Sequence, residues 1–155
     1  MILKNYRIKV HSLLKADFLS LVSEVQQLKD KLSRQDYLSH HKVKWLVTIK
    51  IHMKETIPQD PSHQDYFCAN SKSVLKDYPN IRRKKIQERY RLFFVFSTNP
   101  QEIGYVWFNG EDTLRKYGDK NDPYNIMLTY LNNGTIPKNS KDILKKCENY
   151  TEPMV

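Results

Sequence analysis

Apolar and polar residues follow two different periods in the N-terminal half of the chain. Residues 6–11 alternate with a period of two, which predicts a short, half-buried strand. From residue 13 to about residue 33, apolar side chains recur every three or four positions, so this segment is predicted to be a helix with one apolar face. A second such stretch over residues 37–56 predicts another helix, which Pro58 should end because proline has no backbone N–H to donate. The two helices should form a hairpin.

The middle of the chain changes to a different pattern. Residues 58–79 mix Pro, Asp, Ser, His and Asn with few aliphatic residues, which predicts a long loop with at most a short helical turn at residues 73–77. Three strands are then predicted, at residues 81–86, 89–96 and 103–108. A turn at residues 97–100 should join the last two strands, so the three are expected to form an antiparallel sheet.

The last third of the chain contains signals for helix starts and stops. Residues 111–117 are expected to form a short helix. Asp122 and Pro123 supply an N-cap and a first-turn proline for a second helix, which should run to about residue 131 and stop at an Asn-Gly pair. The chain is polar after residue 138, and we expect a loosely held tail there.

This order of elements predicts a small α+β domain. The helical hairpin should pack on one face of the antiparallel sheet, with a C-terminal helix, and the other face should stay open for a ligand. With 155 residues, 39% of them hydrophobic, the chain is long enough for a single core. We therefore expect one domain over residues 1–138, followed by a polar C-terminal tail over residues 139–155.

The charge of the chain points to a polyanionic partner. There are 26 Lys and Arg residues against 17 Asp and Glu, a net charge of +9. Clustered cations gain free energy when they release the counterions of nucleic acid, and membrane phospholipid is the competing polyanion. No run approaches the roughly 18 apolar residues of a membrane-spanning helix, and residues 1–10 do not resemble a signal peptide. We expect a cytoplasmic protein that does not enter a membrane.

The residues that usually hold metal ions are poorly placed for it here. The two cysteines lie far apart without ligand spacing, so neither a disulfide framework nor a zinc site is indicated. All five histidines precede the predicted central strands, away from the basic run described below. The acids at positions 111, 112, 119 and 122 do not form the carboxylate cluster of a two-metal nuclease. The expected chemistry uses no metal and no cofactor.

The candidate site is a run of six cations and one acid between Arg82 and Arg91, which continues into an aromatic strand. Period-two alternation places Arg82 and Lys84 on one face of their strand, and Arg89 and Arg91 on one face of the next. These four cations should converge on a phosphate. The link at residues 86–88 could instead hold a one-residue shift, which would bring residues 83 and 85 inward. A solvated sheet edge rich in Lys and Arg is the other interpretation.

A second group of polar residues follows the sheet: Arg115, Tyr117, Lys120 and Tyr124. They lie on a turn and a helix start, where backbone amides also favour anions. Tyrosine can stack on a base or exchange a proton with a ribose hydroxyl, although both tyrosines could equally be ordinary core residues. A lysine among other cations has a lowered pKa, which suits a general base. We expect these cations to stabilise a pentacovalent phosphate while a ribose hydroxyl of the RNA acts as nucleophile.

Two segments carry a resemblance to a known family. Arg-Tyr-Arg-Leu-Phe-Phe at residues 89–94 and Trp-Phe-Asn-Gly-Glu-Asp-Thr-Leu-Arg-Lys-Tyr-Gly-Asp-Lys-Asn-Asp-Pro-Tyr at residues 107–124 strongly resemble the YhaV toxins, and the helical N-terminal half is more weakly similar. YhaV toxins belong to the RelE-like superfamily of bacterial toxin-antitoxin pairs. The resemblance implies a RelE-like fold and an endoribonuclease, or mRNA interferase, that cuts messenger RNA on the ribosome and arrests translation.

The resemblance also implies roles for individual residues. The catalytic residues would be Arg91, Lys84, Arg82, Arg115, Lys120 and Tyr124, and the substrate-binding residues would be Arg89 and Tyr117. Arg91 and Lys120 would stabilise the transition-state phosphate, while Lys84 or Arg82 would contribute charge or proton transfer. Tyr124 would stack on the substrate or deprotonate it.

The same resemblance implies a protein partner. YhaV toxins are encoded beside an antitoxin similar to PrlF, a swapped-hairpin DNA-binding protein of the AbrB class, through which the toxin would reach operator DNA. The net charge suggests that an acidic antitoxin segment covers the basic face. Two alternatives to the enzyme stay open: a non-catalytic nucleic-acid-binding protein, and an inactive toxin that serves as co-repressor of its antitoxin.

Overall fold

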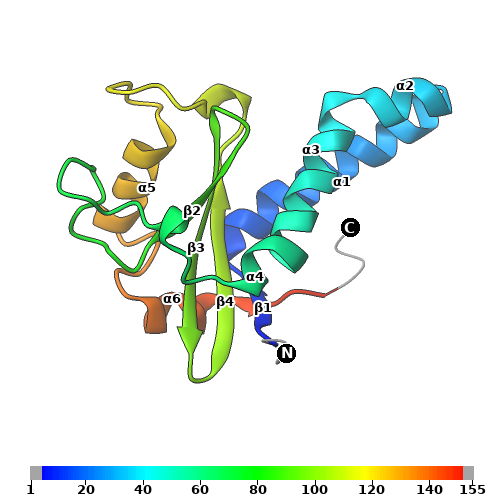
Figure 1. Ribbon diagram of the computed structural model, residues 1–155. Coiled ribbons are helices and arrows are strands. Elements are labelled where there is room, and N and C mark those ends of the chain that lie inside the picture. Colours follow the sequence, from blue (N-terminus) through cyan, green and yellow to red (C-terminus); the bar gives the residue numbers. More distant parts are fainter. Residues whose placement is uncertain (1–4, 152–155) are drawn as a thin grey trace.

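A five-stranded sheet organises the computed structural model, which describes residues 5–151. The strands are β1 (Arg7–Val10), β2 (Arg82–Ile86), β3 (Tyr90–Thr98), β4 (Gln101–Phe108) and β5 (Glu148–Asn149). They lie in the order β2-β3-β4-β1-β5. Figure 1 shows helices on both sides of this sheet, so the predicted α+β class is confirmed.

The sheet is mixed rather than antiparallel throughout. β2, β3 and β4 pair antiparallel as predicted, and β5 pairs antiparallel with β1. β1, however, runs parallel to β4, with Val10 opposite Tyr105. The antiparallel pairing predicted for the three central strands is therefore confirmed, and β1 adds a parallel strand whose direction the sequence did not predict. Alternation within β1 predicts a strand but carries no information about the direction of a partner that follows much later in the chain.

The predicted helical hairpin covers one face of the sheet. Its elements are α1 (Ser12–Lys31), α2 (Arg34–Ser39), α3 (His41–Ile51), the π-helical turn η1 (His52–Thr56) and α4 (Ile57–Gln59). The apolar faces of α1 and α3 pack on the side chains of β3 and β4 that point to this side, among them Leu92, Phe94 and Tyr105. Figure 1 shows the far end of the hairpin, at α2, projecting away from the sheet.

The second helix of the hairpin is divided where one continuous helix was predicted. His40 has an extended backbone, and its ring Nδ1 accepts a hydrogen bond from Lys42 N at 3.1 Å, which begins α3. Pro58 does not end the helical segment, because it lies in the first turn of α4, where a missing N–H breaks no hydrogen bond. The π-helical turn between them is tied to the sheet, since the buried Tyr105 hydroxyl donates to Met53 O at 2.6 Å.

The face of the sheet that was predicted to stay open is covered. Two helices, α5 (Pro123–Asn132) and α6 (Ser140–Lys146), pack against it, together with parts of the loop before β2. Phe93 and Val95 of β3 meet Met127 and Leu131 of α5 in a second core. The sequence did not predict this cover, because the residues that form it come from a loop and two short helices without a long apolar period.

Residues 140–149 are firmly packed, in place of the loosely held tail that the sequence suggested. Ile143 is fully buried, and Leu144 presses so closely on Gly104 of β4 that a Cβ there would lie 2.9 Å from Leu144 Cδ2. β5 then pairs with β1 at the edge of the sheet. Residues 152–155 of the expected tail lie outside the described residues. The domain limit at residue 138 stays a prediction.

Two local features position the face of β3 that carries Arg91. Gln87 has a φ of +52° and forms the tight turn between β2 and β3, which sets the register of the two strands. A β-bulge in β4 then makes Phe93 pair with Trp107 and Phe94 with Tyr105. The predicted loop at residues 58–79 is confirmed apart from its first two residues, which belong to α4, and the short 3₁₀ helix η2 (Gln64–Tyr66).

The packing of α6 can be tested by truncating its buried side chain. Ile143→Ala should lower the free energy of unfolding by about 2–5 kcal/mol, because the methyl groups removed are fully buried against the sheet. The control is Lys141→Ala, an exposed change in the same helix, which should stay within about 0.5 kcal/mol. Urea unfolding followed by circular dichroism measures both. Equal stability of the two variants would mean that α6 does not hold to the sheet.

Candidate functional site

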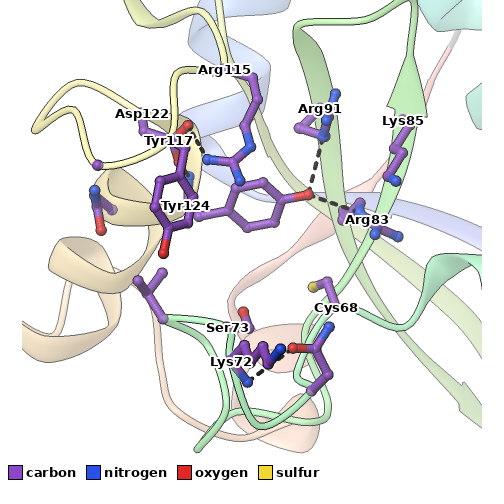
Figure 2. A pocket seen from close by; sticks show the side chains of 14 residues that line it. Cys68, Lys72, Ser73, Arg83, Lys85, Arg91, Arg115, Tyr117, Asp122 and Tyr124 are labelled. Atoms are coloured by element: carbon purple, nitrogen blue, oxygen red, sulfur yellow. Dashed lines mark hydrogen bonds and ion pairs between the residues drawn. The ribbon is translucent and has the colours of Figure 1, made fainter.

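A pocket of about 410 Å³ lies on the side of the sheet covered by α5. It is bordered by β2, β3, the turn before α5 and a loop around residue 70 (Figure 2). Its walls carry five cations and one acid: Lys72, Arg83, Lys85, Arg91, Arg115 and Asp122. This excess of positive charge in a concave site favours an anionic ligand.

The Tyr124 hydroxyl lies at the centre of the cationic wall. Its oxygen accepts a hydrogen bond from Arg83 Nε at 2.9 Å and another from Arg91 Nε at 3.0 Å. Figure 2 shows the two bonds meeting at that oxygen. A hydroxyl oxygen has two lone pairs, and both are engaged here, so the O–H group is directed elsewhere as a donor.

Asp122 fixes the other side of the same tyrosine. Its side chain is only 2% exposed, and Oδ1 accepts hydrogen bonds from Arg115 Nη1 at 2.6 Å and from Lys116 N at 2.8 Å. Oδ2 accepts from Tyr124 N at 3.0 Å, which confirms the predicted helix cap. Arg115 Cζ then lies 4.8 Å from the centroid of the Tyr124 ring. One buried carboxylate therefore orients both a cation and the helix that carries the tyrosine.

Arg91 is held before any ligand arrives. It is 6% exposed, and its Nη1 donates to two backbone carbonyls, Glu88 O at 3.0 Å and Tyr90 O at 2.9 Å. Its own backbone N–H donates to Oδ1 of the fully buried Asn109 at 2.7 Å. The Asn109 Nδ2 group donates to Arg89 O and Thr113 O, so the start of β3 is tied to the loop after β4. A cation fixed in this way loses little freedom when it meets an anion.

The strand register decides which cations of β2 reach the pocket. Arg83 lies opposite Phe93 and Lys85 opposite Arg91, and both line the pocket. Arg82 and Lys84 point to the hairpin side. There Arg82 Cζ is 5.3 Å from the ring centroid of Phe96 and Lys84 Nζ is 5.9 Å from that of Tyr66. The predicted convergence of Arg82 and Lys84 with Arg91 is therefore wrong, and the one-residue shift describes the geometry.

Some of the remaining predicted residues line the pocket, and others lie outside it. Arg115, Tyr117 and Tyr124 line the pocket as one group, and Tyr117 is 89% exposed at its rim. Arg89 precedes β3 and does not line the pocket; its Nε donates to Arg115 O at 3.2 Å, and its carbonyl accepts from Arg115 N at 2.9 Å. Lys120 lies on the turn before α5 and does not line the pocket either.

Several pocket residues could not be found by sequence reasoning. They come from the loop before β2 and from α5: Cys68, Asn70, Lys72, Ser73, Val74 and Asn125. The loop has no period and no charge run, so nothing in its sequence indicates that it folds over the cations of a later strand. Its buried Leu75, which packs in the second core, holds it there.

The Cys68 thiol is neutral in this pocket. Burial raises its pKa to about 11, although the nearby Arg83 and Arg82 act in the opposite direction. Its Sγ donates to Ile81 O at 3.4 Å. A thiol in this state is a poor nucleophile, so Cys68 contributes packing at the base of the pocket.

Two features are absent from the part of the chain that the structure describes, residues 5–151. Within this range, no three His, Cys, Asp or Glu side chains lie where they could together hold a metal ion. In the same part of the chain, no helix is long and apolar enough to cross a membrane. No histidine is among the residues that line the cationic pocket.

Comparison with known proteins identifies the family. A family described as toxins with endonuclease activity, of toxin-antitoxin systems, matches residues 8–148. The chain belongs to the YhaV toxin family. The ribonuclease toxin YhaV of Escherichia coli strain K12 is 32% identical over 129 residues, which cover 83% of each chain. The toxin YhaV of Escherichia coli O157:H7 is equally similar over the same share of both chains. No solved structure matches the chain significantly.

These comparisons confirm the resemblance that two sequence segments carried. The matched range of the family includes both segments and every residue that lines the pocket. The chain is therefore a toxin with endonuclease activity that belongs to a toxin-antitoxin system, and an antitoxin is its expected class of partner. The cationic pocket lies within this matched range.

The state of the Cys68 thiol can be tested by alkylation. At pH 8 its reaction with iodoacetamide should be about a hundredfold slower than that of an exposed thiol whose pKa is 9.0, because a pKa of about 11 lowers the thiolate fraction by that factor. The rate should rise with pH. Peptide mass spectrometry after timed labelling measures it, and labelling in urea is the control. Native labelling as fast as labelling in urea would show that the thiol is not buried.

Proposed function

We propose that the chain is an endoribonuclease toxin that cuts messenger RNA at the cationic pocket. The observation that carries this proposal is the pair of guanidinium groups, from Arg83 and Arg91, that meet at the Tyr124 hydroxyl. Both cations are fixed beside an open pocket, where a phosphodiester would find positive charge on one side and a hydrogen-bond donor in the middle. The matching toxin of strain K12 is named a ribonuclease, which supports RNA as the substrate.

The proposed reaction needs no metal ion. The ribose 2′-oxygen attacks the adjacent phosphorus and the bond from phosphorus to the 5′-oxygen breaks, which leaves a 2′,3′-cyclic phosphate and a 5′-hydroxyl end. Arg83, Lys85 and Arg91 would stabilise the negative charge that develops on the phosphate oxygens. The 2′-hydroxyl proton passes to solvent, and the leaving 5′-oxygen gains one.

Tyr124 fits the role of a proton donor in this reaction. Because Arg83 and Arg91 engage both lone pairs of its oxygen, the oxygen is not available to remove a proton from the substrate. The O–H group can instead donate to the leaving 5′-oxygen and regain a proton from solvent. This assignment replaces the role of a base that the family resemblance suggested.

The register of β2 against β3 changes the roles proposed for the other cations. Lys85 takes the place expected for Lys84, and Arg83 takes that of Arg82. Arg115 is paired with Asp122, so we propose that it supports the Tyr124 ring more than it neutralises substrate charge. Lys120 lies outside the pocket and is left without a catalytic role.

We also propose a setting for this activity. The antitoxin would be a PrlF-like protein of the AbrB class, with an acidic segment that covers the pocket and a DNA-binding part that connects the pair to operator DNA. Within residues 5–151, four of the five pocket cations have no carboxylate partner, and an acidic segment would supply one. The substrate would be messenger RNA on the ribosome, which places the toxin in the cytoplasm.

Two neighbouring arginines offer a matched test of the site. Arg83→Ala should reduce the rate of RNA cleavage by about 10²–10³-fold, because it removes one of the two guanidinium groups that hold positive charge at the Tyr124 hydroxyl, where the phosphate is proposed to bind. Arg82→Ala, one residue away on the opposite face, should stay within about threefold of the wild type, because its side chain lies over Phe96 and not in the pocket. Arg91 is less suitable for truncation, since its side chain also holds two backbone carbonyls.

The measurement for this pair is growth after induction without the antitoxin, combined with mapping of new 5′ ends in messenger RNA. Purified variants with intact circular dichroism spectra supply the rates. If Arg82→Ala loses activity and Arg83→Ala keeps it, the pocket is not the active site. If the wild-type chain binds RNA and creates no new ends, it is a nucleic-acid-binding protein instead.

The proposed nucleophile can be tested in the substrate. RNA that carries a 2′-deoxyribose on the 5′ side of the mapped cut should bind with similar affinity and remain uncut, because the attacking oxygen is missing. Cleavage of unmodified RNA should continue in excess EDTA and yield 2′,3′-cyclic phosphate ends, which mass spectrometry identifies. Cleavage of the deoxy substrate, or loss of activity in EDTA that added magnesium restores, would contradict the mechanism.

A further inference from the structure

The pocket wall opposite Arg83, Arg91 and Arg115 carries mostly uncharged polar groups. It is formed by the loop around residue 70, and Figure 2 shows Lys72 and Ser73 across the pocket from Tyr124 and Arg115. Apart from Lys72, the polar groups on this wall and on the adjoining turn of α5 are uncharged: Asn70, Ser73 and Asn125. A nucleotide in the pocket would place its phosphate against one wall and its base towards the other.

The loop has a fixed shape. Asn70 O accepts from Ser73 N at 3.0 Å, and Leu75 is fully buried in the second core. Further along, the Tyr78 hydroxyl donates to Asn132 Oδ1 of α5 at 3.2 Å. A wall held by backbone hydrogen bonds and a buried anchor presents its polar groups in defined positions, which recognition of a base requires.

In each of the three neutral side chains, one polar group makes a hydrogen bond within the protein, and a second polar group remains available to a ligand. Asn70 Oδ1 accepts from Lys72 N at 3.1 Å, and Ser73 Oγ accepts from Leu75 N at 3.1 Å. Among the described residues, the Asn70 amide nitrogen and the Ser73 hydroxyl hydrogen then have no acceptor. Asn125 shows the reverse, since its Nδ2 donates to Asp119 O at 2.8 Å and its Oδ1 remains available as an acceptor.

We propose that Asn70, Ser73 and Asn125 read the edge of the base next to the cut phosphate, and so set the cleavage sequence. This inference rests on the proposed function of the pocket. Phosphate contacts carry no sequence information, whereas amide and hydroxyl groups distinguish the donor and acceptor pattern of a base edge. Single-stranded RNA suits such a site, because its bases can turn outwards and stack on an aromatic side chain. Tyr117, exposed at the rim, supplies that stacking surface.

The test compares two substitutions that add the same charge to the same loop. Asn70→Asp keeps the oxygen that holds Lys72 N but replaces the free donor by an acceptor. Ser71→Asp places an equal charge one residue away, at a position that does not line the pocket. The purified wild type and each variant cut a library of random RNA, and sequencing of the new ends gives the base preference at each position.

The expected result is a change in preference at one position beside the cut for Asn70→Asp, by about fivefold to a hundredfold between bases. Ser71→Asp should keep the wild-type preference. An unchanged preference in Asn70→Asp, with the wild type cutting selectively, would overturn this inference alone. The inference would also be overturned if Asn70→Asp and Ser71→Asp lowered the cleavage rate equally on all RNA sequences. A wild type that cuts no RNA would overturn both this inference and the proposed function.

Discussion

Repulsion between like charges is the constraint around which this pocket is built. Arg83 and Arg91 both reach one hydroxyl oxygen, and Arg115 lies over the ring of the same tyrosine. Cations held close together repel strongly where few water molecules screen them. In the fold, hydrogen bonds to oxygen atoms and contact with the face of an aromatic ring offset this repulsion. Without these groups the cations would be expected to separate into solvent.

The compensating groups come from distant parts of the chain. Backbone carbonyls of Glu88 and Tyr90 accept from Arg91, the carbonyl of Asp65 accepts from Arg83, and the carboxylate of Asp122 accepts from Arg115. The strand, the loop and the helix cap that supply them must all be in place before the cations can converge. The pocket is therefore a product of the complete fold, and a phosphate that arrives there meets cations that are already held in position.

The sequence was informative where a structural rule is local. The cap at Asp122 and Pro123, the apolar stripe of α1 and the alternation of β1 each depend on residues close together in the chain, and each was predicted correctly. The strand register could not be predicted, because it depends on the conformation of Gln87, and a shift by one residue exchanges Arg82 for Arg83. The loop that faces the cations was also beyond prediction. Its place is set by burial of Leu75 in the second core, to which a helix much later in the chain contributes Met127 and Leu131.

The order of strands has a consequence for how the molecule can be approached. β2, which carries Arg83 and Lys85, is one edge of the sheet, whereas β1 and β5 lie together at the other edge. Tyr150 N also donates to Ile8 O, so the first and last described segments run side by side there. Any label, linker or fused domain joined before β1 or after β5 therefore starts at the far side of the sheet from β2. Both attachment points therefore lie away from the strand that carries Arg83 and Lys85.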